Sequence, residues 1–358
     1  MSGSMYANAT GWTYRRQLLM TASAFALIAM TSTAEGSGND TDNPPIWIEF
    51  SGGLDSLTDA HDLFTPSYML ATQRSDFETG SPRDLQRGPH MGWDADVKLT
   101  FQPEGTDWVL SAAARYGRVL RHQHEHSQPP PYAITPSYGY AIGPFAFYEA
   151  TARNMEGHVI IDFHAGKDVG LGLFGARGSS VFSLGARYAH FDSRSDVQLS
   201  SHTTLSGYRA NVFHGTSDIR HQFSGIGPSI SWDAAAPFAG TVENGSLWLD
   251  WGANAAILFG KQSTRGTHET RAPHRVSYTG STAVYGSNHS TVARRRSRSV
   301  TNLGGYAAIS YRLESVKLSV GYKADMFIGA IDGGIDAAKK EDRAFFGPYA
   351  SISIGLGG

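Results

Sequence analysis

The chain has no cysteine among its 358 residues, so no disulfide can cross-link it. An excess of charge is also lacking, because 30 Lys and Arg stand against 32 Asp and Glu, a formal net charge of −2. A nucleic-acid-binding domain is normally strongly basic, so we expect no nucleic-acid partner. After the N-terminal segment, no apolar run reaches the roughly 18 residues that indicate a membrane-spanning helix. If the rest of the chain crosses a membrane, it must do so as a closed β-barrel.

The N-terminus has the features of an export signal. Arg15 and Arg16 precede a short apolar run, residues 18–30, and small residues follow at 32–34. The run is too short for a spanning helix, which needs about 20 residues. We therefore predict three segments: a signal peptide over residues 1–34, a periplasmic linker over 35–45 and an outer-membrane β-barrel over 46–358.

The stretch MGWDADVKLTF, residues 91–101, alternates between apolar and polar side chains from Trp93 to Phe101. Alternation with a period of two predicts a β-strand with two unlike faces. Nine other segments resemble it, although in 247–259 apolar residues occupy both faces. Each is long enough for a tilted transmembrane strand of about 9–11 residues. The ten predicted strands cover residues 46–57, 91–102, 107–119, 157–168, 179–192, 220–233, 247–261, 301–313, 315–331 and 344–356.

Long and short connections alternate along the chain. We predict short or moderate turns at 103–106, 169–178, 234–246 and Glu314, and longer polar loops at 58–90, 120–156, 193–219, 262–300 and 332–343. In an outer-membrane barrel the short turns are periplasmic and the long loops extracellular. The pattern thus predicts an all-β fold, a transmembrane antiparallel up-and-down β-barrel of about ten strands (range 8–12). A further strand around residues 140–148 is an alternative.

The last predicted strand has one apolar face, formed by Ala350, Ile352, Ile354 and Leu356. A final amphipathic strand at the C-terminus is typical of outer-membrane barrels. Together with the signal peptide, it favours the outer membrane of a Gram-negative bacterium as the location.

Several segments resemble one known family. These are IIDFHAGKDVGLG, SLGARYAHFDS, FSGIGPSISWD, YRLESVKLSVGYKADMF and FFGPYASISIGLG. They resemble the Legionella major outer-membrane protein family of pore-forming proteins, over roughly residues 157–358 and more loosely over 46–120. The resemblance implies an outer-membrane barrel with a porin-like role, and it carries no site residues.

If the apolar faces meet lipid, the polar faces line the lumen. Mixed charges there have two interpretations: salt-bridge ladders that close a narrow interior, or charged rings that select ions. A ten-stranded barrel is narrow, since open aqueous channels belong to 16–18 strands. The predicted pore-lining residues are Asp94, Asp96, Lys98, Arg115, Asp162, Arg187, Asp233, Arg312, Lys317, Lys323 and Asp325, with Glu49, His164 and Asp250 beside them.

Aromatic side chains lie largely toward the ends of the predicted strands. Such positions are typical of the interfacial girdles of membrane barrels. The candidates are Trp47, Trp93, Phe101, Trp108, Tyr116, Tyr188, Trp232, Trp251, Tyr311 and Tyr322.

Two further clusters carry possible chemistry. A basic cluster, Arg294, Arg295, Arg296 and Arg298, is expected in an extracellular loop, where it either pairs with lipopolysaccharide phosphates or is simply solvated. His122, His124 and His126 share one face of an extended chain and could bind a metal. Their position beside Pro129–Pro131 favours a solvated rim, so we expect neither metal nor cofactor.

No GxSxG, HExxH or P-loop motif occurs, so we expect no enzyme, with a barrel lipid hydrolase as the least favoured alternative. The predicted function is an outer-membrane pore-forming, porin-like protein for passive passage of small solutes or ions. Its partners would be outer-membrane lipids, lipopolysaccharide and those solutes. The alternative is a non-transporting barrel whose loops bind host, phage or lipopolysaccharide.

Overall fold

The computed structural model describes residues 45–58, 68–69, 78–79, 91–127, 149–169, 178–205, 209–241, 245–276, 282–333, 338 and 340–356. The predicted signal peptide, nearly all of the predicted linker and the possible strand at 140–148 lie outside these residues. None of the described residues forms a helix long and apolar enough to span a membrane.

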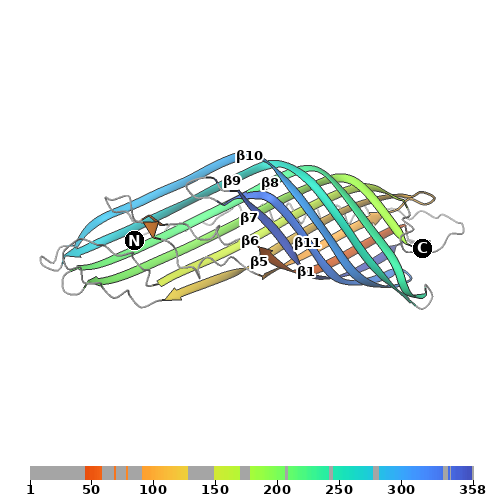
Figure 1. Cartoon of the computed structure of the whole chain (residues 1–358), viewed down its shortest axis with the longest axis horizontal. Coiled ribbons are helices and arrows are strands. Elements are labelled where there is room, and N and C mark those ends of the chain that lie inside the picture. Colours follow the sequence, from red (N-terminus) through yellow and green to blue (C-terminus); the bar gives the residue numbers. More distant parts are fainter. Residues whose placement is uncertain are drawn as a thin grey trace, which may run out of the picture. The chain divides into compact units, whose positions relative to one another are not determined.

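Ten antiparallel strands form a closed barrel (Figure 1), as predicted. Neighbours along the chain pair with each other, and β1 closes the barrel by pairing with both β4 and β12. The strands are β1 (Ile46–Thr58), β4 (Met91–Phe101), β5 (Trp108–Ser127), β6 (Glu149–Asp168), β7 (Ser179–Leu205), β8 (Arg209–Thr241), β9 (Gly245–Val276), β10 (Thr282–Leu313), β11 (Val316–Asp332) and β12 (Lys340–Leu356). A separate two-stranded sheet joins β2 (Tyr68–Met69) to β3 (Glu78–Thr79).

The two ends of the barrel differ. At one, here called the turn end, residues 102–107 join β4 to β5 and residues 314–315 join β10 to β11. Ile46 of β1 pairs with Leu356 of β12 at this same end. The opposite end, here called the far end, is where β7, β8, β9 and β10 continue well past their neighbours.

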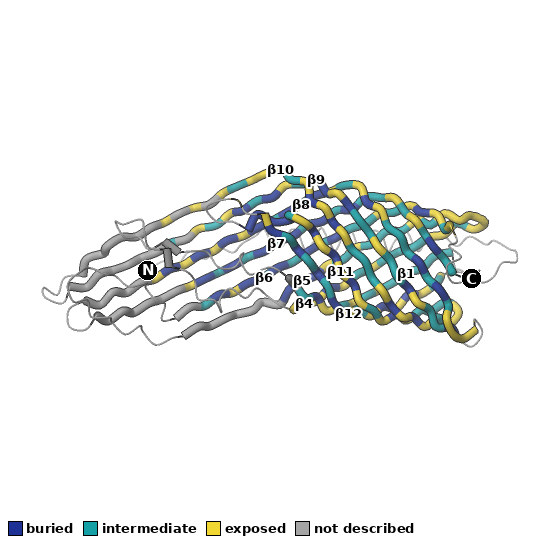
Figure 2. The backbone as a smooth tube through the Cα atoms, viewed as in Figure 1, coloured by how far each residue is buried: buried dark blue, intermediate teal, exposed yellow. Residues whose placement is uncertain are grey.

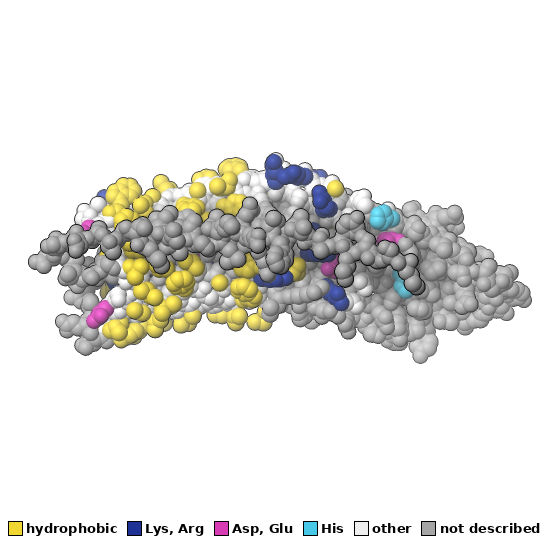
Figure 3. Space-filling model, turned by 180° about the vertical axis from the view of Figure 1, so that it is seen from behind, with side chains coloured by type: hydrophobic (Ala, Val, Ile, Leu, Met, Phe, Trp, Pro, Cys, Tyr) yellow, Lys and Arg dark blue, Asp and Glu magenta, His cyan; other side chains and the backbone are white. Residues whose placement is uncertain are grey.

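The predicted orientation of the strand faces is confirmed. Along β4, Trp93, Val97 and Phe101 are exposed, whereas Asp94 is buried. The outward apolar side chains of the other strands, such as Leu184 and Val320, are also exposed. They form a belt, here called the apolar band, which Figure 3 shows as hydrophobic side chains gathered over one part of the barrel wall. Figure 2 shows the exposed and buried residues alternating along these strands.

Several predicted strand ends are wrong, because the strands are longer than their hydrophobic patterns. β7 ends at Leu205 and β8 begins at Arg209, so the predicted loop at 193–219 is mostly strand. β9 and β10 likewise occupy most of the predicted loop at 262–300, and β8 continues through 234–241. The extensions are rich in Ser, Thr, Arg and His. Backbone pairing satisfies their hydrogen bonds without an apolar face, so hydrophobic periodicity could not detect them.

β11 bends near its far end. Gly329 has a φ of 67°, in the left-handed region that favours glycine, and the pairing with β12 shifts register between Phe327 and Ile331. Beyond this bulge, residues 330–333 are all buried. Residues 329–332 at the end of β11, with residue 333 that follows them, are here called the lumen cap.

Candidate functional site

The barrel encloses a polar cavity of about 180 Å³. That volume is enough for several water molecules. Side chains of both charges line it, from strands all around the wall. Of the predicted pore-lining residues, Asp96, Lys98, Arg115, Asp162, Arg187, Asp233, Lys317, Lys323 and Asp325 border this cavity, as do Glu49, His164 and Asp250.

Arg187 ties several strands together across the lumen. Its Nε and Nη2 donate to the two carboxylate oxygens of Asp162 at 2.6 and 2.9 Å, a bidentate pair. Its Nη1 donates to the side-chain oxygens of Asn254, at 2.6 Å, and Asn302. One guanidinium therefore connects β6, β7, β9 and β10.

A second set of ion pairs connects β4, β5 and β11. Lys323 donates to Asp94, whose side chain is fully buried. Arg115 Nη1 donates to Asp325 Oδ2 at 2.5 Å, and Arg115 Nε lies 3.5 Å from Asp96 Oδ2. Asp325 Oδ1 is 3.8 Å from Arg187, so the two sets meet. We call the whole the lumen network.

Toward the turn end, separate contacts continue the polar lining. Lys317 pairs with Asp250 at 2.6 Å, and the Tyr306 hydroxyl donates to Asp233 at 2.8 Å. Arg312 instead lies over the rings of Trp47 and Trp248, 5.0 and 5.9 Å from their centroids. It therefore faces the lumen as predicted but does not border the cavity.

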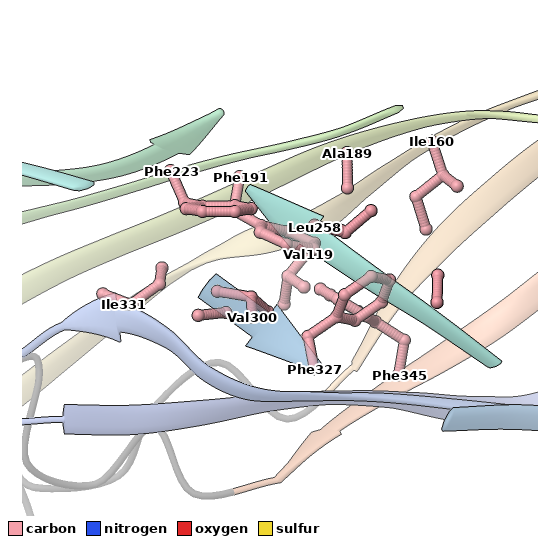
Figure 4. Close-up of a cluster of buried hydrophobic side chains, with 12 residues drawn as sticks. Val119, Ile160, Ala189, Phe191, Phe223, Leu258, Val300, Phe327, Ile331 and Phe345 are labelled. Atoms are coloured by element: carbon pink, nitrogen blue, oxygen red, sulfur yellow. The ribbon is translucent and has the colours of Figure 1, made fainter. Parts of the chain in front are cut away.

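An apolar layer closes the lumen on the far side of the lumen network. Phe191, Phe223, Phe327 and Phe345 are 0–2% exposed and come from β7, β8, β11 and β12. The Phe191 ring centroid lies 4.7 Å from that of Phe327 and 5.7 Å from that of Phe345. Figure 4 shows these side chains together with Val119, Leu258 and Val300 inside the barrel. An apolar constriction of this kind disfavours the passage of water and ions.

The lumen cap completes this closure. Gln262 of β9 donates to the Gly329 carbonyl at 2.6 Å, and Thr264 of β9 donates to the Asp332 carbonyl at 3.1 Å. Arg294 of β10 pairs with the Asp332 carboxylate at 3.1 Å. Since β10 separates β9 from β11 in the wall, the cap reaches β9 only by folding across the inner face of the barrel.

His221 of β8 lies beside the cap, beyond the apolar band, which on β8 begins at Ile226. Burial lowers the pKa of His221 to about 4, against the opposing effect of its hydrogen bond to the Asp332 backbone carbonyl, which raises the pKa. The nearby guanidinium of Arg343 lowers the pKa further. His221 is therefore neutral at pH 7, and its Nδ1 lies 3.3 Å from the Thr264 hydroxyl.

Three buried side chains form the one group among the described residues that has a metal-binding arrangement. Asp55, Asp94 and His158 each offer a ligand atom within 4.8 Å of the others. However, Asp94 already accepts from Lys323 and lies 3.9 Å from Arg115. Two cations at one ligand disfavour a divalent metal, so we assign the group to the lumen network. The side chains of the predicted histidine set, 122–126, lie outside the described residues.

Two predicted placements need correction. The arginines at 294–298 lie within strand β10, not in a loop. Arg294, Arg296 and Arg298 follow its inward-facing alternation, although Arg296 is exposed, and Arg295 follows the outward one. Trp47 belongs to no outer girdle, because it lies on the lumen face beneath Arg312. The other girdle candidates follow the outward alternation of their strands, and Trp93, Phe101, Trp108, Tyr116, Tyr311 and Tyr322 are 39–54% exposed.

Some lumen residues were not identified from sequence. Arg343 and Glu156 form a fully buried pair at 2.7 Å, yet both lie at or beyond the ends of the predicted strands. The apolar layer was also missed, although it left a signal. Ala256 and Leu258 are buried inside the barrel, which explains why both faces of 247–259 are apolar.

No known family model and no curated protein matches the chain. Among solved structures, it is similar to the transport unit of the autotransporter AIDA-I from Escherichia coli. That match has 8% identity and a TM-score of 0.18 and covers 93% of this chain and 97% of the other. The P. putida toluene transporter TodX matches with 8% identity, 90% and 91% coverage and a TM-score of 0.21. The CymD monoaromatic hydrocarbon channel matches with 10% identity, 89% and 90% coverage and a TM-score of 0.19.

Proposed function

We propose that the protein is an outer-membrane barrel that passes small polar solutes or ions when its lumen cap moves aside. One observation carries this proposal. A charged cavity large enough for several water molecules is separated from the far end of the barrel by the apolar layer and by the lumen cap, a short segment that is joined to the rest of β11 through a glycine bulge. In this proposal the described conformation is the closed state of the pore.

The apolar band supports a membrane location. Large apolar side chains such as Phe50, Leu184, Ile226 and Val320 are 49–71% exposed around the wall. In water this surface would far exceed the few hundred Å² that soluble monomers leave exposed in one patch. In a Gram-negative outer membrane, by contrast, lipid covers it, and the closed strand ladder satisfies the backbone.

The cap is the part of the closure that can move at least cost. The lumen network links β4, β5, β6, β7, β9, β10 and β11, so opening it would disrupt buried ion pairs in much of the wall. The cap is held to β9 and β10 mainly by the contacts of Gln262, Thr264 and Arg294. Its outward movement also draws Ile331 out of the apolar layer.

A non-transporting surface barrel is the second candidate. The lumen network favours it, because ion pairs and hydrogen bonds that join seven strands stabilise a permanently filled interior. The far-end extensions of β7, β8, β9 and β10 would then serve as the interaction surface.

Planar-bilayer recording of the refolded protein separates the two candidates. The pore proposal predicts a closed baseline with brief openings whose conductance scales with salt concentration. A barrel that inserts, as shown by protection of its strands from protease, but never conducts would favour the second candidate. Replacement of Lys317 by Glu should shift the reversal potential toward cation selectivity if this residue lines the path.

A further inference from the structure

Four cations lie together on the outer wall at the far-side border of the apolar band. Arg220 of β8, Lys261 and Arg265 of β9, and Arg295 of β10 all follow the outward alternation of their strands and are exposed. Arg220 of β8 lies directly opposite Arg265 of β9. Arg295 of β10 lies opposite Ser263, which is between Lys261 and Arg265 on β9. We call these four residues the basic collar.

The collar begins where the lipid-facing surface ends. Phe259, 61% exposed, is two residues before Lys261 on β9, and both face outward. On the outward face of β8, Ile226, 60% exposed, is the last large apolar residue before Ser224, Gln222 and Arg220. Figure 3 shows Lys and Arg side chains next to the hydrophobic belt on the face it presents. The collar therefore lies at the height of the lipid headgroups.

Within the described part of the wall, the charges of the collar are balanced only at Arg220, which lies near Asp192 of β7 and Asp218 of β8. Arg220 pairs with Asp192 of β7 at 2.6 Å, but the described residues offer no ionic partner to Lys261, Arg265 or Arg295. Like charges directly opposite each other on neighbouring strands destabilise a sheet, as Arg220 and Arg265 do here. The other outward residues of 220–224, 261–265 and 293–299 are Gln222, Ser224, Ser263, Ala293, Ser297 and Ser299. No acidic side chain is among them.

We propose that the basic collar binds the phosphate groups of a glycolipid in the outer leaflet, the lipid A part of lipopolysaccharide. Arginine grips phosphate through two parallel hydrogen bonds, and neighbouring serine hydroxyls can donate further ones. A bound phosphate offsets the repulsion between Arg220 and Arg265. The acyl chains of the same lipid would cover Ile226 and Phe259, which is why we assign a lipid-borne phosphate and not a free one. The inference rests on the outer-membrane location proposed above.

The proposal changes the role expected for the cluster at 294–298. Of its arginines, Arg295 alone belongs to the collar, and its partners come from β8 and β9. The lipid site is thus built across three strands, and one stretch of sequence could not reveal it.

The test uses the full barrel in nanodiscs of phosphatidylcholine that contain either bisphosphorylated or dephosphorylated lipid A. Lipid A that co-purifies with the protein is measured by mass spectrometry. We expect about tenfold more retention of the phosphorylated form. The triple variant Lys261→Gln, Arg265→Gln, Arg295→Gln should lose this preference. A matched variant, Arg153→Gln, Lys167→Gln, Lys340→Gln, removes three exposed cations elsewhere and should keep it.

Equal retention of the two lipids by the wild-type barrel would overturn the proposal even if the triple variant failed to fold. Displacement of lipid A by millimolar inorganic phosphate would overturn the assignment to a lipid-borne group. Conductance is recorded separately on the same preparations in bilayers. A conducting barrel without lipid A preference would refute the collar alone, and a silent barrel with the preference would refute the pore alone.

Discussion

At the scale of residues, the strongest contacts in the lumen are ion pairs with at least one buried partner. The Asp94 side chain is fully buried, and Lys323 is its closest cation. Removing one partner of a buried pair leaves an uncompensated charge, which costs about 3–5 kcal/mol. Lys323→Met should therefore lower the free energy of unfolding by about 3 kcal/mol, measured in urea from the fraction that keeps folded electrophoretic mobility.

The double variant Asp94→Asn, Lys323→Met is the control for this prediction. It removes both charges, so it should recover most of the loss, since an uncharged pair leaves no buried ion. If Lys323→Met and the wild type unfold with the same urea midpoint, the stabilising role that we assign to the lumen network is contradicted.

Sequence reasoning placed many lumen side chains correctly because a strand has only two faces. Once Trp93 and Val97 are assigned to the lipid side, Asp94, Asp96 and Lys98 must point inward. The ion-pair partners of these side chains could not be predicted from the sequence. Asp94 and Lys323 are 229 positions apart, and only the barrel register brings them together. The aromatic Trp47 was misplaced because an indole suits either an interface or a cation in the lumen.

At the scale of elements, the glycine bulge in β11 determines whether the cap fits into the lumen. A side chain at Gly329 would have space, since the nearest atom is Lys340 Cδ at 3.9 Å, but the φ of 67° disfavours any Cβ. The left-handed region costs a non-glycine residue about 1–2 kcal/mol. Gly329→Ala should therefore weaken the closed state and raise the open probability in bilayers roughly fivefold.

Gly52→Ala is the matched control for that variant. Gly52 has no positive φ, and its nearest neighbour would be the Asp94 carbonyl oxygen at 3.8 Å. We expect wild-type gating from it. Equal open probabilities for the wild type, Gly329→Ala and Gly52→Ala would show that β11 does not pivot at the bulge.

The cap should also respond to acid. The pKa of His221 is about 4 in the closed state and about 6.5 when the side chain is exposed. The lowered pKa means that the neutral form stabilises closure above pH 6.5 and that this contribution is lost as the pH falls toward 4. Between pH 7 and pH 5 the closed state should lose about 2 kcal/mol.

Recordings at the two pH values check this. The wild type should open more often at pH 5, whereas His221→Gln, which cannot gain a proton, should change much less. Arg343, Arg294 and Asp332, the charged groups near His221, are unaltered in both proteins. A change in open probability with pH that both proteins show is therefore caused by groups other than His221. Identical pH profiles for the two proteins would remove His221 from the gating mechanism.

The length of the elements shows where sequence patterns stop being informative. The ten strands were found because lipid imposes apolar residues on one face of each. That constraint ends at the edge of the band, and past it β8 continues through His221, Arg220 and Asp218 with no apolar face. Cross-strand pairs such as Arg194 with Asp218, at 2.7 Å, stabilise this part instead. Hydrophobic periodicity cannot predict such ion pairs.

At the scale of the whole molecule, the barrel is closed by two different means. The lumen network fixes the wall, and the apolar layer with the cap blocks the path beside it. A ten-stranded barrel is narrow enough for its own side chains to do both. The porin-like function predicted from sequence therefore requires a moving part, which no pattern in the sequence indicated.

Reversible cross-linking of the cap tests the central claim most directly, and a chain without cysteine suits the method. In the variant Thr264→Cys, Asp332→Cys, a short cleavable thiol cross-linker joins β9 to the cap, with each single variant as control. Loss of the Asp332 carboxylate removes one contact between the cap and β10, so the uncross-linked double variant should conduct more than the wild type. We predict that cross-linking abolishes the conductance and that reductant restores it. Conductance that persists after complete cross-linking, or silence in both states, would contradict a pore gated by the lumen cap.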